Sequence, residues 1–150
     1  MKIEGWREPD HRPHIAVDNL IVKGNKILLL KRQIYPFQGK LDYPAGMVEY
    51  GETVEHAAIR EAKEETGLKI KLKEILGVYS SPTRDPRFHT ISVAFIAEPV
   101  SGKLKSSFEG KVNWYDIKKI KLKDFGFDHV KIFKDYLKWI KKKGTYWSTK

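Results

Sequence analysis

Three glutamates lie close together in the sequence, Glu61, Glu64 and Glu65. The stretch 53–66 has the pattern of a helix, beginning at a capping threonine and stopping before Gly67. At about 100° per residue, Glu65 falls inside the narrow apolar stripe of this helix and Glu61 at its edge. A core-facing carboxylate is costly unless it is paired or binds a metal. Because hard carboxylate oxygens suit magnesium, with manganese as an alternative, the pattern indicates a divalent cation site.

The charge distribution supports the same interpretation. The chain carries a net charge of +10, yet the segment 49–65 holds six glutamates against Arg60 and Lys63, a local −4 that leaves +14 elsewhere. A basic protein favours an anionic partner such as a phosphate or nucleotide. An acidic cluster within it suggests a cation held where a polyanion also binds. The alternative is a solvated acidic helix face.

Hydrophobic periodicity and turn residues predict the elements that must position these glutamates. Besides the helix, they are strands at Ile15–Val22, Lys26–Arg32, Lys69–Ser80, His89–Ala97 and Lys111–Ile117, an irregular loop at 33–46 and a last helix capped by Asp128. Strands around one central helix, with a second helix at the end, favour a mixed α/β layered fold. At 150 residues, we expect a single domain over 1–150.

Composition excludes several classes of site. The chain has no cysteine, so disulfides, thiolate zinc sites and cysteine nucleophiles are excluded. Its longest apolar runs fall far short of the roughly 20 residues of a membrane helix. Residues 1–5 are charged and lack an apolar core, so no secretory signal is visible. We expect a cytoplasmic protein without a membrane partner.

The spacing of the glutamates matches a longer motif. It reads Gly46-x5-Glu52-x7-Arg60-Glu61-Ala62-x-Glu64-Glu65-x-Gly67-Leu68, which agrees with the Nudix box at every specified position, Ala62 being smaller than the usual branched aliphatic residue. The chain resembles a Nudix hydrolase from about residue 14 to about residue 140. The resemblance implies the α/β/α sandwich of that family, with a mixed central sheet. It also implies metal-dependent hydrolysis of a nucleoside diphosphate linked to another group.

The resemblance further implies roles for individual residues. Glu61, Glu64 and Glu65 resemble the metal-binding glutamates, Glu61 being an alternative general base, and the carbonyl of Ala45 resembles the backbone ligand of the family. Arg60 and Glu52 resemble the pair that braces the glutamates. Glu109 occupies the region where many members keep a further acidic ligand or base.

The substrate is indicated by a second set of residues. Pro82 follows Gly67 by 15 residues, where a proline marks the ADP-ribose pyrophosphatases of the family. The stretch 80–90 looks like the Pro-x-Arg-Asp-Pro-Arg-x-His segment of small ADP-ribose hydrolases, and 127–129 looks like their Phe-Asp-His. The implied products are AMP and ribose 5-phosphate. The stretch 41–46 departs from the Leu-Pro-Gly-Gly of many members.

Arginines and aromatic residues supply candidate substrate contacts. Arg84 and Arg87 could make bidentate contacts to the diphosphate or terminal ribose, or could instead brace their own turn. Arg32 is a further phosphate candidate. Aromatic side chains that could stack on adenine are those of Tyr35, Phe37 and Tyr43. We expect His89 and His129 to order their loops.

Rival functions remain open at this point. A nucleotide-sanitising or dinucleoside-polyphosphate Nudix hydrolase would share every residue of the box. From another class, the charge of +10 permits a basic nucleic-acid-binding module, but the lysines are dispersed and only six residues are arginine, which argues against nucleic acid. The sequence leaves a homodimer open.

Overall fold

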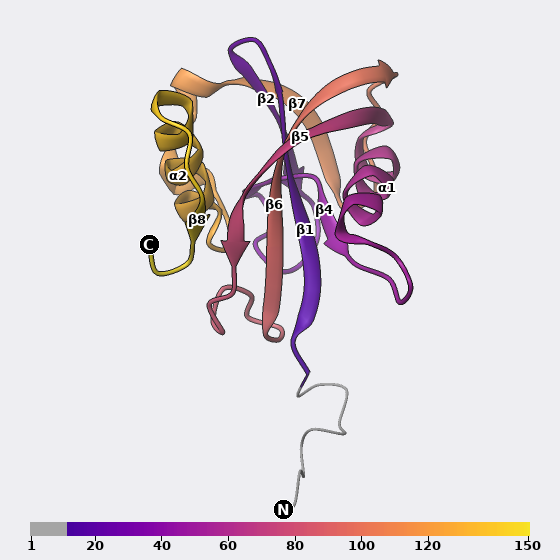
Figure 1. Ribbon diagram of the computed structural model, residues 1–150. Helices are drawn as coiled ribbons and strands as arrows, with labels where there is room; N and C mark the ends of the chain where they lie inside the picture. The colour runs from indigo at the N-terminus through magenta and orange to yellow at the C-terminus, as the bar shows by residue number, and fades with distance from the viewer. Residues whose placement is uncertain (1–11) are drawn as a thin grey trace, which may run out of the picture.

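A curled mixed sheet lies between two helices in the computed structural model, which describes residues 12–150 (Figure 1). The N-terminal stretch inspected for a secretory signal lies outside these residues. In chain order the elements are β1 His14–Lys23, β2 Lys26–Arg32, β3 Leu41–Asp42, β4 Ala45–Met47, α1 Val54–Thr66, β5 Leu68–Tyr79, β6 Thr90–Gly102, β7 Gly110–Asp116, α2 His129–Lys141 and β8 Tyr146–Trp147. Two single-turn 3-10 helices, Ile117–Lys119 and Leu122–Asp124, precede α2.

β1 is the strand around which the sheet is organised. The strand order is β3-β2-β1-β6-β5-β8, with β4 paired to β1 and β7 paired to β2. β1 runs parallel to β6 and antiparallel to β2 and β4. Because β1 pairs with β4 at Asp18 and Ala45, the strand holds the start of the glutamate motif directly beside the sheet.

Helix α1 packs closely against one face of the sheet because its buried residues are small. Ala57 and Ala58 contact Val17 and Phe95 in one cluster of the core. The buried Asn19 of β1 donates its side-chain N–H to the carbonyl oxygen of Ala58 at 3.0 Å. This close approach brings the acidic edge of α1 next to β4.

Helix α2 covers the other face, as Figure 1 shows. Its apolar side chains Ile132, Phe133 and Tyr136 join the largest cluster of the core. Asp128 stands at the N-cap as expected, but its side chain makes no capping hydrogen bond. Its carboxylate instead accepts two hydrogen bonds from Arg84, at 2.9 and 2.8 Å.

The α/β sandwich that the sequence predicts is confirmed, although β8 was not predicted and the bounds of several other elements differ. The loop predicted at 33–46 contains β3 and β4, which are too short to give a periodic signal. β6 also continues to Gly102, beyond the predicted end at Ala97. No helix among residues 12–150 has both the length and the apolar content that a membrane span requires.

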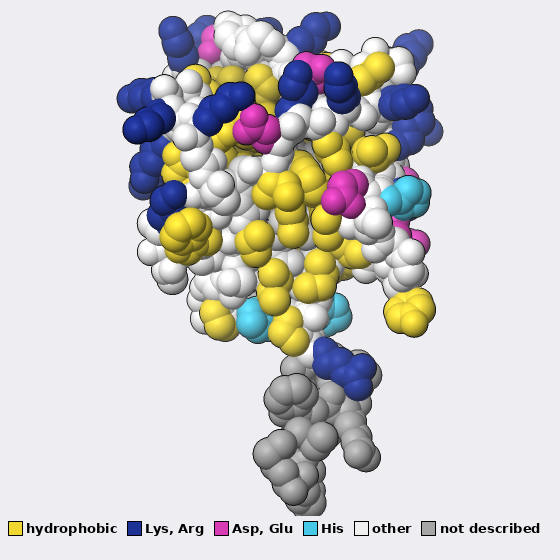
Figure 2. Space-filling model, viewed as in Figure 1, with side chains coloured by type: hydrophobic (Ala, Val, Ile, Leu, Met, Phe, Trp, Pro, Cys, Tyr) yellow, Lys and Arg dark blue, Asp and Glu magenta, His cyan; other side chains and the backbone are white. Residues whose placement is uncertain are grey.

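The surface carries separate apolar and basic regions. Figure 2 shows apolar side chains gathered over the strands between the two helices. Exposed apolar residues of β1 and β5 include Ile15, Ile75 and Val78. Lysine and arginine side chains surround the upper end and flanks in the same view.

Replacement of two glycines with left-handed backbone, Gly67 at the end of α1 and Gly51 before the helix, tests how α1 is terminated. Gly67 has a φ of +79°, and a Cβ there would lie 2.3 Å from the carbonyl oxygen of Lys103. Gly51 has a similar φ of +86° but open space around it. We expect Gly51→Ala to cost about 1–2 kcal/mol of unfolding free energy, the strain of the left-handed backbone. Gly67→Ala should cost clearly more, because the backbone around Lys103 must also move.

Urea unfolding of both variants measures the difference. Equal losses of stability would show that the approach of Lys103 to Gly67 adds nothing to the end of α1.

Candidate active site

A cleft of about 340 Å³ opens where β1, the β3–β4 segment, α1 and α2 meet. Glu61, Glu65 and Glu109 line its acidic wall. The basic side chains in its lining are those of Arg32, Arg84 and Arg87. Six residues that the sequence singles out are therefore brought to one cleft, although they come from four separate segments of the chain.

Arg60 ties the glutamate motif together from outside the cleft. Its guanidinium donates to Glu52 at 2.6 and 3.1 Å, to Glu61 at 2.8 Å and to Glu64 at 3.3 Å. It also donates to the carbonyl oxygen of Met47 at 3.0 Å. The hydrogen bonds from Arg60 lower the pKa of Glu52 to about 2. Glu64 is the outermost of the three helix glutamates, since its side chain is 58% exposed.

Glu65 is the buried member of the cluster, being 6% exposed. Its Oε2 accepts a hydrogen bond from the N–H of Ala45 at 3.2 Å. Burial raises the pKa of Glu65 well above its usual range, and a hydrogen bond with the Glu109 carboxyl raises it further. Two ionised carboxylates placed together out of water repel each other, so a cation bound beside them would stabilise the pair.

Glu61 occupies the space that a side chain at position 46 would fill. A Cβ on Gly46 would lie 2.0 Å from the carboxyl carbon of Glu61. Burial raises the pKa of Glu61 although Arg60 opposes the shift. A larger residue at position 46 would therefore displace the carboxylate of Glu61 from its position beside β4.

The donor set fits a divalent cation. The carboxylates of Glu61, Glu65 and Glu109 supply oxygen atoms, and the backbone of Ala45 lies against one of them. Hard cations such as magnesium prefer such oxygen ligands. Burial is the main cause of the raised pKa values of Glu61 and Glu65, so both carboxylates are costly to ionise here, and a bound cation would offset that cost.

The basic wall is held by ion pairs. Arg32 is buried and donates to Asp42 at 2.7 Å and to the carbonyl of Pro36 at 2.5 Å. Arg84 is buried between Asp128, at 2.8 Å, and Asp18, at 3.4 Å.

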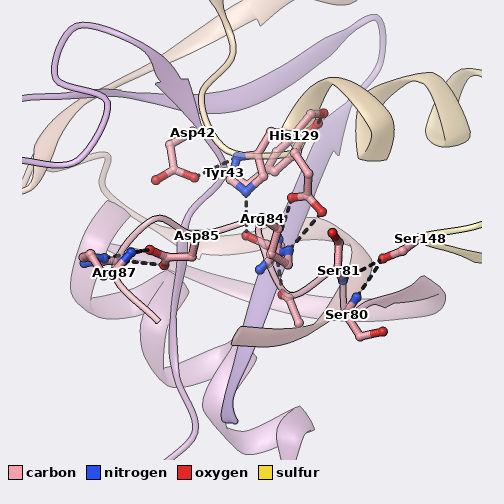
Figure 3. Close-up of polar contacts among 12 residues, drawn as sticks. Asp42, Tyr43, Ser80, Ser81, Arg84, Asp85, Arg87, His129 and Ser148 are labelled. Atoms are coloured by element: carbon pink, nitrogen blue, oxygen red, sulfur yellow. Dashed lines mark hydrogen bonds and ion pairs between the residues drawn. The ribbon is translucent and has the colours of Figure 1, made fainter. Parts of the chain in front are cut away.

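Arg87 is the most accessible of these three arginines, with 35% of its side chain exposed. It pairs with Asp85 at 2.8 Å within the loop between β5 and β6 (Figure 3). Arg84 and Arg87 thus both have intramolecular partners, as the bracing interpretation of the loop requires, while both also face the cleft.

His129 lies between two buried aspartates that sequence analysis missed. Its Nδ1 is 3.0 Å from Asp42 and its Nε2 is 3.3 Å from Asp18. Burial alone would lower the pKa of His129, but the two aspartates outweigh it and raise the pKa to about 10. The signal available in the sequence was the polar pair Asp18-Asn19 within the otherwise apolar run Ile15–Val22.

The aromatic candidates divide by burial. Tyr43 is fully buried and donates its hydroxyl to the carbonyl oxygen of His129 at 3.1 Å, so of the two roles open to it, stacking on adenine or packing in the core, it has the packing role. Tyr35 and Phe37 are exposed, and the ring of Phe37 packs on Phe127.

Comparison with known proteins agrees with this architecture. Residues 12–136 match the model of the NUDIX domain. The chain is 52% identical over 128 residues to a protein of Methanocaldococcus jannaschii named ADP-ribose pyrophosphatase, covering 85% of this chain and 75% of that protein.

Solved structures share the fold. A NUDIX hydrolase from Nitrosomonas europaea superposes with a TM-score of 0.77 at 25% identity, covering 90% of this chain and 77% of the other. A MutT/nudix family protein from Enterococcus faecalis has a TM-score of 0.75 at 28% identity, covering 87% and 63%. With the motif, the cleft and these matches together, the chain belongs to the Nudix hydrolase family.

Proposed function

We propose that this protein hydrolyses the diphosphate bond of ADP-ribose, giving AMP and ribose 5-phosphate. The observation that carries the proposal is the single cleft in which a wall of carboxylates faces three arginines. An acidic wall suits a divalent cation, and a basic wall suits an anionic substrate. The name of the Methanocaldococcus jannaschii relative, 52% identical, supports ADP-ribose as the substrate.

We assign the cation to Glu61, Glu64 and Glu65 with the carbonyl of Ala45, and expect magnesium, or manganese in its place. The chemistry that such an ion would supply is polarisation of the phosphoryl oxygens and a lower pKa for water. Arg60 and Glu52 hold the helix glutamates in place. Cytoplasmic location and a homodimer remain predictions of the sequence.

Two carboxyls are candidates for accepting the proton of the attacking water. Glu61 is one, and Glu109, which hydrogen-bonds Glu65, is the other. Because both face the cleft, either can reach a substrate bound there. Of the arginines, Arg87 is the most suitable for direct contact with the substrate, since Arg32 and Arg84 are almost completely buried.

Product analysis tests the substrate assignment. With magnesium present, we expect ADP-ribose to be converted to AMP and ribose 5-phosphate in equal amounts. A panel of dinucleoside polyphosphates, NADH and modified deoxynucleoside triphosphates should be cleaved far more slowly. Release of pyrophosphate from a triphosphate, with ADP-ribose left intact, would assign the protein to the nucleotide-sanitising members instead.

Replacement of Glu65 tests the cation site. An acid whose pKa is raised by folding loses stability as the pH rises above its unfolded value, about 4.3. In chelator, Glu65→Gln should therefore be more stable than the wild type at pH 8, and the difference should vanish below about pH 4. At about 100 times its Kd, magnesium should raise the unfolding free energy of the wild type by about 2.7 kcal/mol and that of the variant by much less.

Thermal unfolding with and without magnesium measures both effects, and the variant should lose more than about nine-tenths of turnover. Equal magnesium stabilisation of both proteins would remove Glu65 from the ligand set.

The different burial of Arg84 and Arg87 predicts different effects of their removal. Arg87→Ala should raise KM for ADP-ribose and lower kcat less, because a lost charge-assisted contact of about 1.5–3 kcal/mol corresponds to roughly 10- to 150-fold in kcat/KM. Lysine should restore little, since it lacks the planar two-pronged donor. Arg84→Ala should instead cost about 3–5 kcal/mol of stability, as it leaves buried carboxylates unpaired.

Steady-state kinetics and urea unfolding of the two variants separate these effects. A wild-type KM in Arg87→Ala would show that Arg87 serves the loop alone.

A further inference from the structure

Six charged side chains form one connected chain beneath the basic wall of the cleft. In order of contact they are those of Arg32, Asp42, His129, Asp18, Arg84 and Asp128. Each of these side chains is at most 18% exposed. Figure 3 shows His129 at the centre, between Asp42 and the side that carries Arg84.

The charges balance only if His129 is protonated. Three carboxylates, of Asp18, Asp42 and Asp128, face two guanidiniums, of Arg32 and Arg84. A neutral imidazole would leave one negative charge uncompensated and out of water, which costs several kcal/mol. An imidazolium makes the group neutral and places one ring nitrogen near each flanking aspartate, at 3.0 Å from Asp42 and 3.3 Å from Asp18.

Contacts from every neighbouring element are consistent with an imidazolium. Asp18 comes from β1 and Asp42 from β3, and the ring of Tyr43 packs on the imidazole with centroids 4.7 Å apart. The ring of Phe127 lies on it at 5.2 Å. Aromatic faces attract a cation. The carboxylate of Asp18 also accepts a hydrogen bond from the buried hydroxyl of Ser92 in β6, at 2.5 Å.

A metal ion could also draw these groups together, since ligand atoms of Asp18, Asp42 and His129 lie within 4.8 Å of one another. The ring geometry favours a proton. An imidazole binds a metal through one nitrogen, whereas His129 presents a different nitrogen to each aspartate and its ring occupies the space between them. A divalent ion beside the same carboxylates would also add two charges where balance needs one.

We propose that His129 is a permanently charged positioning residue, which bridges Asp42 and Asp18 and thereby fixes Arg32 and Arg84 at the wall that receives the substrate. The part of the proposal that concerns substrate binding rests on the proposed function. The bridge itself does not, because it follows from the contacts and the charge balance.

Nuclear magnetic resonance of the imidazole nitrogens in the wild-type protein tests the bridge directly. We expect both nitrogens of His129 to be protonated at pH 7–8 and to titrate near pH 10. Added magnesium, manganese or zinc should leave His129 protonated. A neutral ring at pH 7, or a ring nitrogen that loses its proton when one of these metals is added, would overturn the proposal.

Substitution tests the positioning role. His129→Gln should raise KM for ADP-ribose about 10-fold with a smaller change in kcat, and should lower stability. The matched control is Lys131→Gln, because Lys131 lies in the same helix and pairs with another buried aspartate, Asp135, at 2.8 Å, outside the lining of the cleft. The control should keep the wild-type KM.

A second substitution tests charge balance and remains informative if His129→Gln folds poorly. Adding Asp42→Asn to His129→Gln restores equal numbers of buried positive and negative charges. The double variant should therefore be more stable than His129→Gln, although Asp42→Asn alone destabilises the wild type. Simple addition of the two losses would overturn the bridge.

The proposed function and the proposed role of His129 can be contradicted independently. If ADP-ribose is not cleaved, the resonance and double-variant results still decide the state of His129. If ADP-ribose is cleaved and His129→Gln keeps the wild-type KM, the positioning role is wrong while the proposed function stands.

Discussion

The acidic wall depends on the hydrogen bonds that the Arg60 guanidinium donates to the glutamates around it. Glu61 lies three and four residues from Glu64 and Glu65, spacings at which like charges oppose helix formation. Arg60 compensates part of this repulsion through Glu61 and Glu64, and it joins the helix to the preceding loop through Glu52 and the carbonyl of Met47. Its hydrogen bonds therefore fix both the helix and the direction from which the loop reaches it.

The two walls of the cleft obtain their charge in different ways. The basic wall is neutralised internally, because each buried arginine is paired with an aspartate. The acidic wall is not, since Arg60 reaches Glu61, whereas the buried Glu65 carboxylate lies beside that of Glu109 and accepts a hydrogen bond from the N–H of Ala45. This difference makes the acidic wall suited to a cation, while the buried arginines of the basic wall already have partners.

The position of the glutamates could be predicted from the sequence because residues three or four apart in a helix lie on the same face. The N-cap at Thr53 and the stop at Gly67 could be predicted for the same reason, since both depend on residues next to the helix. The bridge between Asp18, His129 and Asp42 could not, because it requires the sheet order that brings three distant segments together. Asp42 lies in a strand of two residues, which has no detectable period.

Because some charged side chains are exposed and others are buried, dissolved salt acts on them differently. The exposed lysines that surround the upper end of the molecule attract an anion through water, and at physiological ionic strength such attraction is screened within about 8 Å. The ion pairs of Arg32 and Arg84 are shielded from solvent ions by burial. Rising salt should therefore weaken the long-range attraction of an anionic substrate while leaving the ion pairs of Arg32 and Arg84 intact.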